Sequence, residues 1–405
     1  MARSAILIGS GITGALTARE LAAAGWDVTI LEAEHVGAGS SSRTAAGIRQ
    51  QFSTPSTVRG MRYAVNWYEG FAAEIEDGTS PIVQNGYLFL YDDPARWQAA
   101  VDVVAVQRAA GLAEVETLEG AALRERFPWV GEHILAGTFC PTDGFLLPHL
   151  VYNEGIKRAI ALGGKLVQRA PVTAVEKSGD RITALVTPKG RFSADLYLDC
   201  TNAWTRRTGR VLGATELPVD PLKRYLWFLA RGGEMSAETL GSMPLVIAPS
   251  GVYCRPENAN SLLLGKLHSA QPEPDFTYAD QDRIDPEFTP ASGVDAVPYG
   301  LWAELAEHLP PVGSFDGFTA TTAGYYGTTP DHNPFLDFDP QVPNLIRMVG
   351  FSGHGAMFGP FTARVGLALA DAGKRISTVR LDGDDVDCTG FHIGRAYDAH
   401  ESMVI

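Results

Sequence analysis

The sequence predicts an α/β protein: a discontinuous Rossmann-like domain with an inserted mixed or antiparallel β-sheet domain. Residues 4–32 read as strand, glycine loop, helix and strand, which is the start of a nucleotide-binding fold. A further apolar strand and helix occur over residues 344–373, and residues 217–268 read as antiparallel strands. Because nucleotide-type segments lie on both sides of a sheet-like segment, an insertion explains their order best.

The individual elements follow from local patterns. Residues 4–8 are an apolar run typical of a buried parallel strand, and Gly25 ends the Ala- and Leu-rich helix that follows. Residues 271–300 are polar and irregular, and a helix is expected after them at 302–308. The other predicted elements are a strand over 26–32, a helix over 54–75, a strand over 86–92, an amphipathic helix over 94–111, and loop, helix, strand, hairpin and buried strand over 143–204. The predicted domains are residues 1–80, 141–215 and 320–380 for the discontinuous nucleotide-binding domain, 81–140 and 216–319 for the inserted substrate domain, and 381–405 for a C-terminal tail.

Composition narrows the choice of partners. The formal net charge is −14 and the pI is about 5.1, which disfavours nucleic acid and anionic membranes because both require a basic face. No run of 18 apolar residues occurs, so no membrane span is expected. The four cysteines form no C-x-x-C pair, so no metal site is expected. Isolated thiols without a signal peptide predict a cytoplasmic protein.

The glycine loop indicates a dinucleotide. Gly9, Gly11 and Gly14 match G-x-G-x-x-G, in which the glycines make the tight turn, admit the pyrophosphate and let the helix pack on the strand. The helix N-terminus offers free N–H groups to the phosphates. Glu32 ends the second strand, where an acidic side chain binds ribose hydroxyls and disfavours a 2′-phosphate. The loop thus argues against NADP and leaves NAD and FAD open.

Three later stretches carry a family resemblance. They are "GAGSSSRTAAGIRQQF" at 37–52, "AGYYGTTPDHNPFLD" at 323–337 and "GFSGHGAMFGPFTARVGLALA" at 350–370. With the glycine loop they make residues 3–372 resemble the D-amino-acid-oxidase-type FAD-dependent oxidoreductases, in the branch of sarcosine oxidase, dimethylglycine dehydrogenase and glycine oxidase. The resemblance implies FAD, with a mixed sheet roofing the flavin. It also implies removal of a hydride from the carbon next to the nitrogen of an amino acid or a secondary or N-methylated amine, giving an imine, with electrons passed to oxygen or another acceptor.

The predicted FAD contacts combine this resemblance with local chemistry. Hydroxyls and a guanidinium at 41–43 suit pyrophosphate oxygens, although a solvated loop is the alternative. Small residues at 44–48 let the backbone run beside the flavin ring. Gly353 and Gly355 let the chain pass close to the same ring just before a helix N-terminus. Trp204 is either a cofactor contact or plain core. The full predicted set is Gly9, Gly11, Ile12, Thr13, Gly14, Glu32, Ala33, Ser40, Ser41, Ser42, Arg43, Thr44, Ala46, Gly47, Ile48, Val172, Thr201, Trp204, Gly324, Gly353, His354, Gly355, Ala356 and Met357.

The predicted catalytic residues are Arg49, Tyr253, Arg255, Tyr326 and His354. Arg49 aligns with an arginine that lies beside flavin and substrate carboxylate in sarcosine-oxidase relatives, and a guanidinium binds a carboxylate with two parallel hydrogen bonds. Tyr326 falls where those relatives carry a pocket tyrosine and glycine oxidase carries an arginine. Tyr253 and Arg255 share one face of a predicted strand, so Arg255 is a candidate second anion clamp. The alternatives are a salt bridge for Arg49, sheet packing for Tyr253 and Arg255, and a loop-shaping histidine rather than a general base for His354.

Three positions depart from the sarcosine oxidase pattern. Gly324 stands where monomeric sarcosine oxidases carry the cysteine that bonds to the flavin, so FAD is expected to be non-covalent. Met357 replaces a lysine that binds the carboxylate, which predicts a more apolar pocket. Leu263 replaces the oxygen-activating lysine, and Lys266 is expected to face the other way. Without a cation near the flavin, fast reaction with oxygen is less favoured, so the protein can be a dehydrogenase rather than an oxidase.

The expected partners are a small-molecule amine or amino acid and oxygen or another electron acceptor, with a homo- or hetero-oligomer left open. A second enzyme hypothesis is an FAD dehydrogenase of a hydroxy acid or polyol. A hypothesis of a different class is a flavin-bearing subunit or assembly factor of a larger complex. An NAD-dependent dehydrogenase would leave the motifs at 323–337 and 350–370 unexplained.

Overall fold

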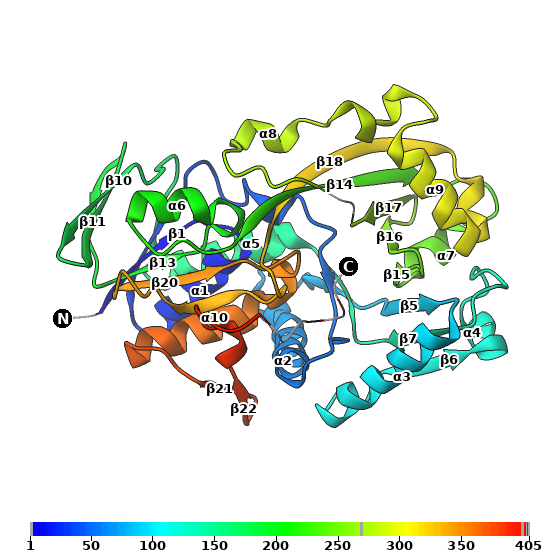
Figure 1. The fold of residues 1–405 in the computed structure, drawn as a ribbon, viewed down its shortest axis with the longest axis horizontal. Helices are drawn as coiled ribbons and strands as arrows, with labels where there is room; N and C mark the ends of the chain where they lie inside the picture. The colour runs from blue at the N-terminus through cyan, green and yellow to red at the C-terminus, as the bar shows by residue number, and fades with distance from the viewer. Residues whose placement is uncertain (1–2, 268–269, 398–400, 402, 404–405) are drawn as a thin grey trace.

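The computed structural model describes residues 3–267, 270–397, 401 and 403. Two large sheets of six and eight strands dominate this part of the chain, with helices packed around them (Figure 1). The first sheet is mainly parallel and the second mainly antiparallel. The predicted α/β fold class is therefore confirmed.

The six-stranded sheet is the Rossmann-like part. Its strand order is β19 (Phe335–Phe338), β20 (Leu345–Val349), β13 (Leu196–Asp199), β1 (Ser4–Ile8), β2 (Asp27–Leu31) and β9 (Lys165–Val167). These pairs are parallel except for β19 with β20. Ala5 and Leu7 belong to the core on one face of the sheet, and Ile6 and Ile8 to the core on the other. Burial on both faces is why β1 is almost wholly apolar.

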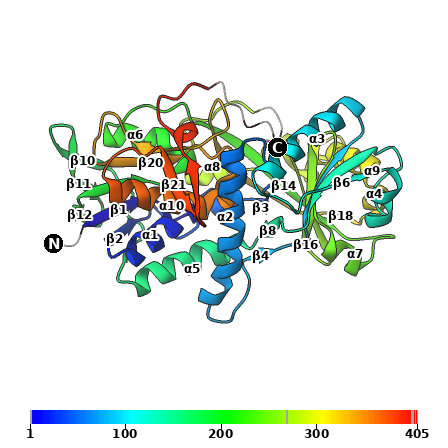
Figure 2. The ribbon, with the colours of Figure 1, turned by 90° about the horizontal axis from the view of Figure 1, so that it is seen from below.

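Helices cover one face of this sheet. They are α1 (Ile12–Ala23), α5 (Pro148–Ala161), α10 (Gly355–Ala372) and α2 (Pro55–Phe71). Helix α2 stands between the two large sheets in both ribbon views (Figure 1 and Figure 2). The opposite face carries α6 (Thr205–Leu212) and a small sheet of β10 (Ala174–Ser178), β11 (Arg181–Thr187) and β12 (Gly190–Phe192).

The eight-stranded sheet follows the order β18 (Gly317–Thr328), β14 (Asp220–Ala230), β17 (Ser261–Lys266), β16 (Val252–Asn258), β15 (Leu245–Ile247), β5 (Tyr87–Tyr91), β7 (Ala136–Cys140) and β6 (Glu116–Glu119). The antiparallel strands expected over 217–268 are thereby confirmed, although residue 268 lies outside the described residues. One face packs with the helices α4 (Gly120–Arg126), α7 (Ala237–Ser242) and α9 (Val297–His308). The other face carries Tyr87, Phe89, Leu226, Tyr253 and Leu263.

Two predicted boundaries are wrong. The helix expected at 302–308 begins at Val297, because Pro298 suits a first helical turn, where its missing N–H costs nothing. The stretch 271–300, expected to be irregular, also holds α8 (Tyr278–Asp282). The helix expected within 344–373 starts at Gly355, with Pro360 inside it.

Local contacts explain how a helix accommodates Pro360. Pro360 has no N–H for the carbonyl of Ala356 four residues earlier. The hydroxyl of Tyr68 on α2 donates to that carbonyl at 2.6 Å. A side chain from another helix thus replaces the missing backbone bond, and the first turns of α10 stay regular.

The remaining elements are short or peripheral. They are α3 (Pro94–Ala109), β3 (Gly47–Ile48), β4 (Ile82–Val83), β8 (Gly144–Leu146) and the hairpin of β21 (Thr378–Leu381) with β22 (Asp384–Asp387). Of the predicted tail 381–405, residues 398–400, 402 and 404–405 lie outside the described residues. The Glu401 carboxylate accepts a hydrogen bond from the N–H of Ser53 at 2.8 Å. No helix in the described part of the chain is long and apolar enough to cross a membrane.

Candidate active site

A cavity of about 690 Å³ lies at the carboxyl ends of the parallel strands. Its walls come from the glycine loop, the end of β2, the loop after β13, the start of α10 and residues 277–279 and 325–326. The predicted cofactor contacts that line it are Gly9, Gly11, Ile12, Thr13, Glu32, Ala33, Ser40, Ser41, Arg43, Thr44, Val172, Thr201, Trp204, Gly353, Gly355 and Ala356. The structure thus brings together residues from six separate stretches of the chain.

The glycine loop has the close contacts that its spacing predicts. Gly9 has a φ of +101°, which a side chain would strain, and it turns the chain out of β1. A Cβ on Gly14 would lie 2.0 Å from the carbonyl oxygen of Gly9, so helix and loop touch there. Gly11 caps α1 without a side chain, and the N–H of Ile12 donates to the hydroxyl of Ser41 at 3.0 Å. The helix N-terminus therefore faces the cavity with little steric cover.

Glu32 is held rigidly at the cavity wall. One carboxylate oxygen accepts hydrogen bonds from the N–H and hydroxyl of Ser10 at 2.8 and 2.7 Å, and the other accepts from the N–H of Glu34. The side chain is 5% exposed, so its charge is directed into the cavity rather than to bulk water. A fixed carboxylate here suits ribose hydroxyls and repels a phosphate.

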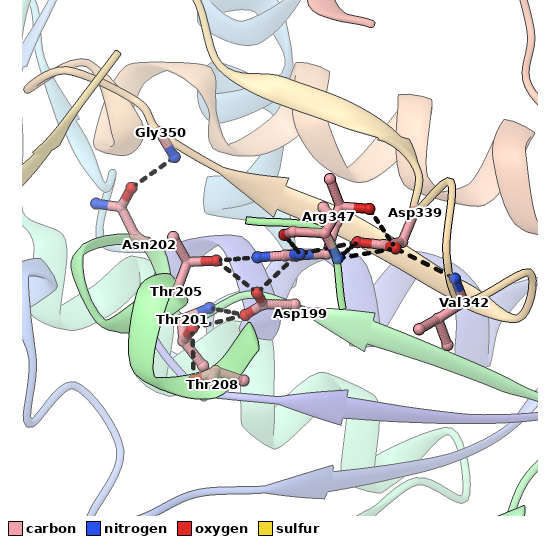
Figure 3. A network of polar contacts seen from close by, with 10 residues as sticks. Asp199, Thr201, Asn202, Thr205, Thr208, Asp339, Val342, Arg347 and Gly350 are labelled. Atoms are coloured by element: carbon pink, nitrogen blue, oxygen red, sulfur yellow. Dashed lines mark hydrogen bonds and ion pairs between the residues drawn. The ribbon is translucent and has the colours of Figure 1, made fainter. Parts of the chain in front are cut away.

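A buried ionic network fixes the loop after β13 (Figure 3). Arg347 on β20 pairs with Asp199 at 3.0 Å and Asp339 at 2.9 Å, and it donates to the hydroxyl of Thr205 at 2.6 Å. Asp199 in turn accepts from the N–H and hydroxyl of Thr201, which lines the cavity. Each charge is fully paired, as burial requires.

The same loop is tied to the loop after β20. The side-chain carbonyl of Asn202 accepts from the N–H of Gly350 at 3.0 Å (Figure 3). It also accepts from the N–H of Phe351 at 3.2 Å. Gly350 leads directly into the glycine-rich start of α10. The network therefore holds two walls of the cavity at a set separation.

Trp204 belongs to the cavity wall as well as to an aromatic cluster. Its ring stacks on Tyr278 with centroids 5.1 Å apart, and its indole N–H has no hydrogen-bond partner within the described residues. Burial raises the pKa of the Tyr278 hydroxyl, which keeps it protonated. Both side chains thus offer donors to a bound ligand.

A second, smaller cavity of about 40 Å³ adjoins the first and shares Thr44, Tyr326 and Gly353 with it. The other residues that line it are Ala45, Ala46, Gly47, Arg49, Tyr87, Leu245, Tyr253, His354 and Met357. It lies under the apolar face of the eight-stranded sheet. Four of the five predicted catalytic residues meet here.

Arg49 is completely buried beside this cavity. Its guanidinium donates to the carbonyl of Gln51 at 2.7 Å and to the carbonyl of Met403, and it lies 4.1 Å from the centre of the Phe52 ring. Its Nε has no hydrogen-bond partner among the described residues. Burial lowers the pKa of Arg49, but a guanidinium stays charged.

His354 is a neutral neighbour of Arg49. Burial, Arg49 and His332 lower the pKa of its imidazole well below the usual value. Its Nε2 lies 3.4 Å from a guanidinium nitrogen of Arg49, so the neutral ring accepts from Arg49 there and carries its proton on Nδ1. His354 also stands at the N-cap of α10.

Two tyrosines close the pocket from the sheet side. Both line the smaller cavity, and burial raises the pKa of the Tyr253 and Tyr326 hydroxyls. Tyr326 packs against Gly353, where an added Cβ would lie 2.4 Å from its ring. These contacts leave an aromatic wall with few polar atoms.

The sequence model of the FAD-dependent oxidoreductase family matches residues 4–369. The chain belongs to this family. FAD is therefore its cofactor, and the cavity residues fit it: a glycine cradle and helix N-terminus for the pyrophosphate, a fixed acid for the ribose and unpartnered donors for the rings.

Several relatives support the assignment. An N-methyl-L-tryptophan oxidase from Salmonella arizonae is 27% identical over 90% of this chain and 94% of its own. An FAD-dependent oxidoreductase domain-containing protein 1 from Xenopus laevis is 26% identical over 81% of this chain and 69% of its own. Among solved structures, the L-proline dehydrogenase from P. horikoshii has a TM-score of 0.81 and 26% identity, covering 94% of this chain and 96% of that one.

Some predicted residues of this FAD-dependent oxidoreductase lie outside both cavity walls. These residues are Gly14, Ser42, Ile48, Gly324 and Arg255. Ile48 is buried in the core, and a Cβ on Gly324 would lie 2.8 Å from that of Arg43. Arg255 donates to the carbonyl of Ala45 at 2.7 Å and pairs with Glu257 at 2.8 Å. It shares the face of Tyr253, as expected, but its guanidinium supports the loop at Ala45.

Two further predicted positions differ in their surroundings. Arg43 lines the larger cavity, yet its guanidinium pairs with Asp282 at 2.7 Å. Lys266 pairs with Glu304 of α9 at 2.7 Å, on the face of the sheet opposite to Leu263, as its spacing predicts. No lysine from this strand therefore reaches the smaller cavity.

Sequence reasoning missed several residues of the site. Tyr278 was hidden in a stretch expected to be irregular, although Thr277 and Asp280 form a capping box that marks a helix start. Tyr87 lies on a predicted strand that carried no motif. Arg224, next to Tyr326, stands beside Lys223 at the start of the apolar run of β14, and no motif marked it as a site residue. The buried carboxyl of Asp143 lies beside Gln50 and Gln51, which no local pattern indicates.

Proposed function

We propose that this FAD-dependent oxidoreductase oxidises a secondary or N-methylated amino acid at the carbon next to nitrogen, giving an imine. The observation that carries the proposal is the buried guanidinium of Arg49 at a small aromatic cavity that shares three lining residues with the cofactor cavity. Within the described residues Arg49 forms no ion pair, and such a buried cation suits a ligand with one carboxylate and an apolar body. The names of relatives, N-methyl-L-tryptophan oxidase, sarcosine dehydrogenase and L-proline dehydrogenase, describe substrates of this kind.

The side chains divide the work between binding and exclusion of water. Arg49 holds the substrate carboxylate, and the hydrogen bond that it donates to the carbonyl of Met403 gives way to that carboxylate. Tyr87, Tyr253 and Met357 form apolar walls that keep water from the reacting carbon. His354 is neutral and orients Arg49, so it adds no charge that would compete with the amine. Bound FAD supplies the two-electron acceptor for the hydride.

We further propose that FAD is held without a covalent bond and that the electron acceptor is not restricted to oxygen. Gly324 offers no side chain for attachment, and Leu263 and the paired Lys266 leave no lysine from β17 at the smaller cavity. Acid precipitation that leaves all flavin in the supernatant is expected. Flavin that stays with the precipitated protein would contradict the first point.

Anaerobic reduction of the holoenzyme tests the proposed function. N-methyl amino acids, imino acids, simple amines and hydroxy acids are added in turn, and bleaching of the flavin is followed before air is admitted. Bleaching by N-methylated or imino acids supports the proposal, and the rate of return in air separates an oxidase from a dehydrogenase. Bleaching by hydroxy acids alone would favour the hydroxy-acid dehydrogenase, and no bleaching by any compound would favour a flavin-bearing subunit or assembly factor.

A further inference from the structure

A second buried arginine packs behind Tyr326, whose ring lines the smaller cavity; Arg224 itself is not among the residues that line either cavity. Arg224, on β14, is 8% exposed, and its guanidinium carbon lies 5.6 Å from the centre of the Tyr326 ring. Register places it opposite Gly324, two residues before Tyr326 on β18. Arg224 therefore packs against one of the two tyrosines that line the smaller cavity from the sheet side.

Strand geometry directs this side chain to the site. Neighbouring residues on a strand point to opposite faces, so Arg224 shares a face with Leu226, and Lys223 shares one with Tyr225. Leu226 belongs to the apolar face above the cavity, and Tyr225 belongs to the core under the helices. Arg224 therefore lies on the side of the sheet that faces the smaller cavity, and Lys223 lies on the opposite side.

Arg224 has no counter-ion among residues 3–267, 270–397, 401 and 403. One guanidinium nitrogen donates to the carbonyl of its neighbour Lys223, and Nε has no hydrogen-bond partner. Burial lowers its pKa, although the group stays charged. A buried charge without a partner is costly, so an anionic ligand would be strongly favoured at this point.

Comparison with other buried arginines makes the contrast clear. Arg347 pairs with two aspartates, Arg255 with Glu257 and Arg395 with Asp331. Arg49 and Arg224 form no such ion pair within the described residues. The guanidinium carbon of Arg49 lies 5.9 Å from the centre of the Tyr87 ring, that of Arg224 lies 5.6 Å from the centre of the Tyr326 ring, and both rings line the smaller cavity.

We propose that Arg224 is a specificity-determining residue that binds a second carboxylate of the substrate. The preferred substrate is then an N-substituted amino acid with a carboxylate at each end, one on Arg49 and one on Arg224. This inference rests on the proposed function for the identity of the reacting amine. The anion preference itself is a property of the two guanidinium groups.

Equilibrium binding to the holoenzyme tests the anion site without turnover. Succinate, glutarate and adipate are each titrated against their monoamides, which have nearly the same shape and one charge fewer. Perturbation of the flavin absorbance reports binding. We expect at least one diacid to bind roughly 10-fold or more tightly than its monoamide, because a buried ion pair is exchanged for a neutral contact.

Variants assign that preference to a residue. In Arg224→Met the ratio between diacid and monoamide falls to about one, and Arg224→Lys keeps part of it. Lys223→Met is the matched control, since it removes an adjacent buried cation on the opposite face and should leave the ratio unchanged. Flavin content is checked first in each variant. Equal binding of diacid and monoamide by the wild type, or an unchanged ratio in Arg224→Met, would overturn the inference.

Kinetics separate this inference from the proposed function. Anaerobic flavin reduction is compared for N-methylglutamate and N-methylglutamine. A preference for N-methylglutamate that Arg224→Met abolishes supports both proposals. Reduction by both compounds without preference keeps the function and overturns the role of Arg224. If diacids bind preferentially through Arg224 but no amine reduces the flavin, the anion site stands and the proposed amine oxidation is overturned.

Discussion

Arg49 combines complete burial with a backbone partner that a substrate carboxylate can replace. Arg49→Met should therefore lower the apparent second-order rate constant of flavin reduction by N-methylated amino acids roughly 100-fold, because truncating one partner of a buried charge pair costs about 2–5 kcal/mol. Stopped-flow reduction under anaerobic conditions measures it. The matched control is an amine of the same skeleton without a carboxylate, whose rate should be similar in both proteins. Equal losses for both compounds would assign Arg49 to the cofactor instead.

Asp143 is a buried carboxyl close to Arg49. It accepts hydrogen bonds from the backbone and side chain of Gln50 and from the side chain of Gln51 at 2.8 to 3.2 Å. Burial nevertheless raises the pKa of Asp143 to about 6 from its usual 3.8. The folded protein therefore binds this proton at a pH where the unfolded chain has lost it.

This shift predicts a pH dependence of stability. Between about pH 6 and pH 4 the Asp143 carboxyl is protonated in the native state and ionised in the unfolded state. The contribution of Asp143 to the free energy of unfolding therefore rises as the pH falls through that window, by up to roughly 3 kcal/mol. Urea unfolding of FAD-saturated wild type and Asp143→Asn at pH 7.5, 6 and 4.5 measures it. The difference between the two proteins should grow in favour of the wild type as pH falls. A difference independent of pH would contradict the assignment.

The start of α10 depends on α2, since the hydroxyl of Tyr68 replaces the N–H that Pro360 lacks. Tyr68→Phe leaves the carbonyl of Ala356 without its partner and should lower the free energy of unfolding by about 1–3 kcal/mol. It should also weaken FAD binding, because Ala356 lines the cofactor cavity. Urea unfolding and flavin titration measure the two effects.

A double mutant provides the control for that prediction. Pro360→Ala restores an N–H that can bond to Ala356, so Tyr68→Phe combined with Pro360→Ala should recover much of the lost stability. Additive losses in the double mutant would show that the tyrosine acts through packing alone. Tyr63 on the same helix is half-buried and offers a matched Tyr→Phe substitution away from α10's first turn.

The cofactor cavity joins the parallel sheet to the inserted sheet, because its walls include the glycine loop as well as residues 277–279 and 325–326. FAD should therefore stabilise the whole molecule. Binding to the native state alone adds about 2.7 kcal/mol to the free energy of unfolding when free FAD is 100 times its Kd. Calorimetry of the apoprotein against rising FAD should show an increasing Tm. A Tm independent of FAD would mean that the cavity does not hold it.

Much of this molecule was readable from local patterns. The βαβ start and the positions of Gly9, Gly14 and Glu32 are set by short-range rules of turn geometry and burial, and the structure contains all of them. Strand alternation also predicted that Lys266 and Leu263 lie on opposite faces of the inserted sheet, as they do. Residues adjacent in sequence constrain each other directly, so such features need no knowledge of the fold.

Contacts between distant segments could not be read in this way. The pairing of Arg49 with Met403, of Pro360 with Tyr68 and of Arg224 with Tyr326 joins residues from separate elements. Arg255 likewise does not line the cavity, because its guanidinium donates to the carbonyl of Ala45, a residue distant in sequence. Which buried charge finds a partner and which stays free for a ligand depends on strand register and on how the sheets pack. Those are long-range properties, and they decide where this protein can bind an anion.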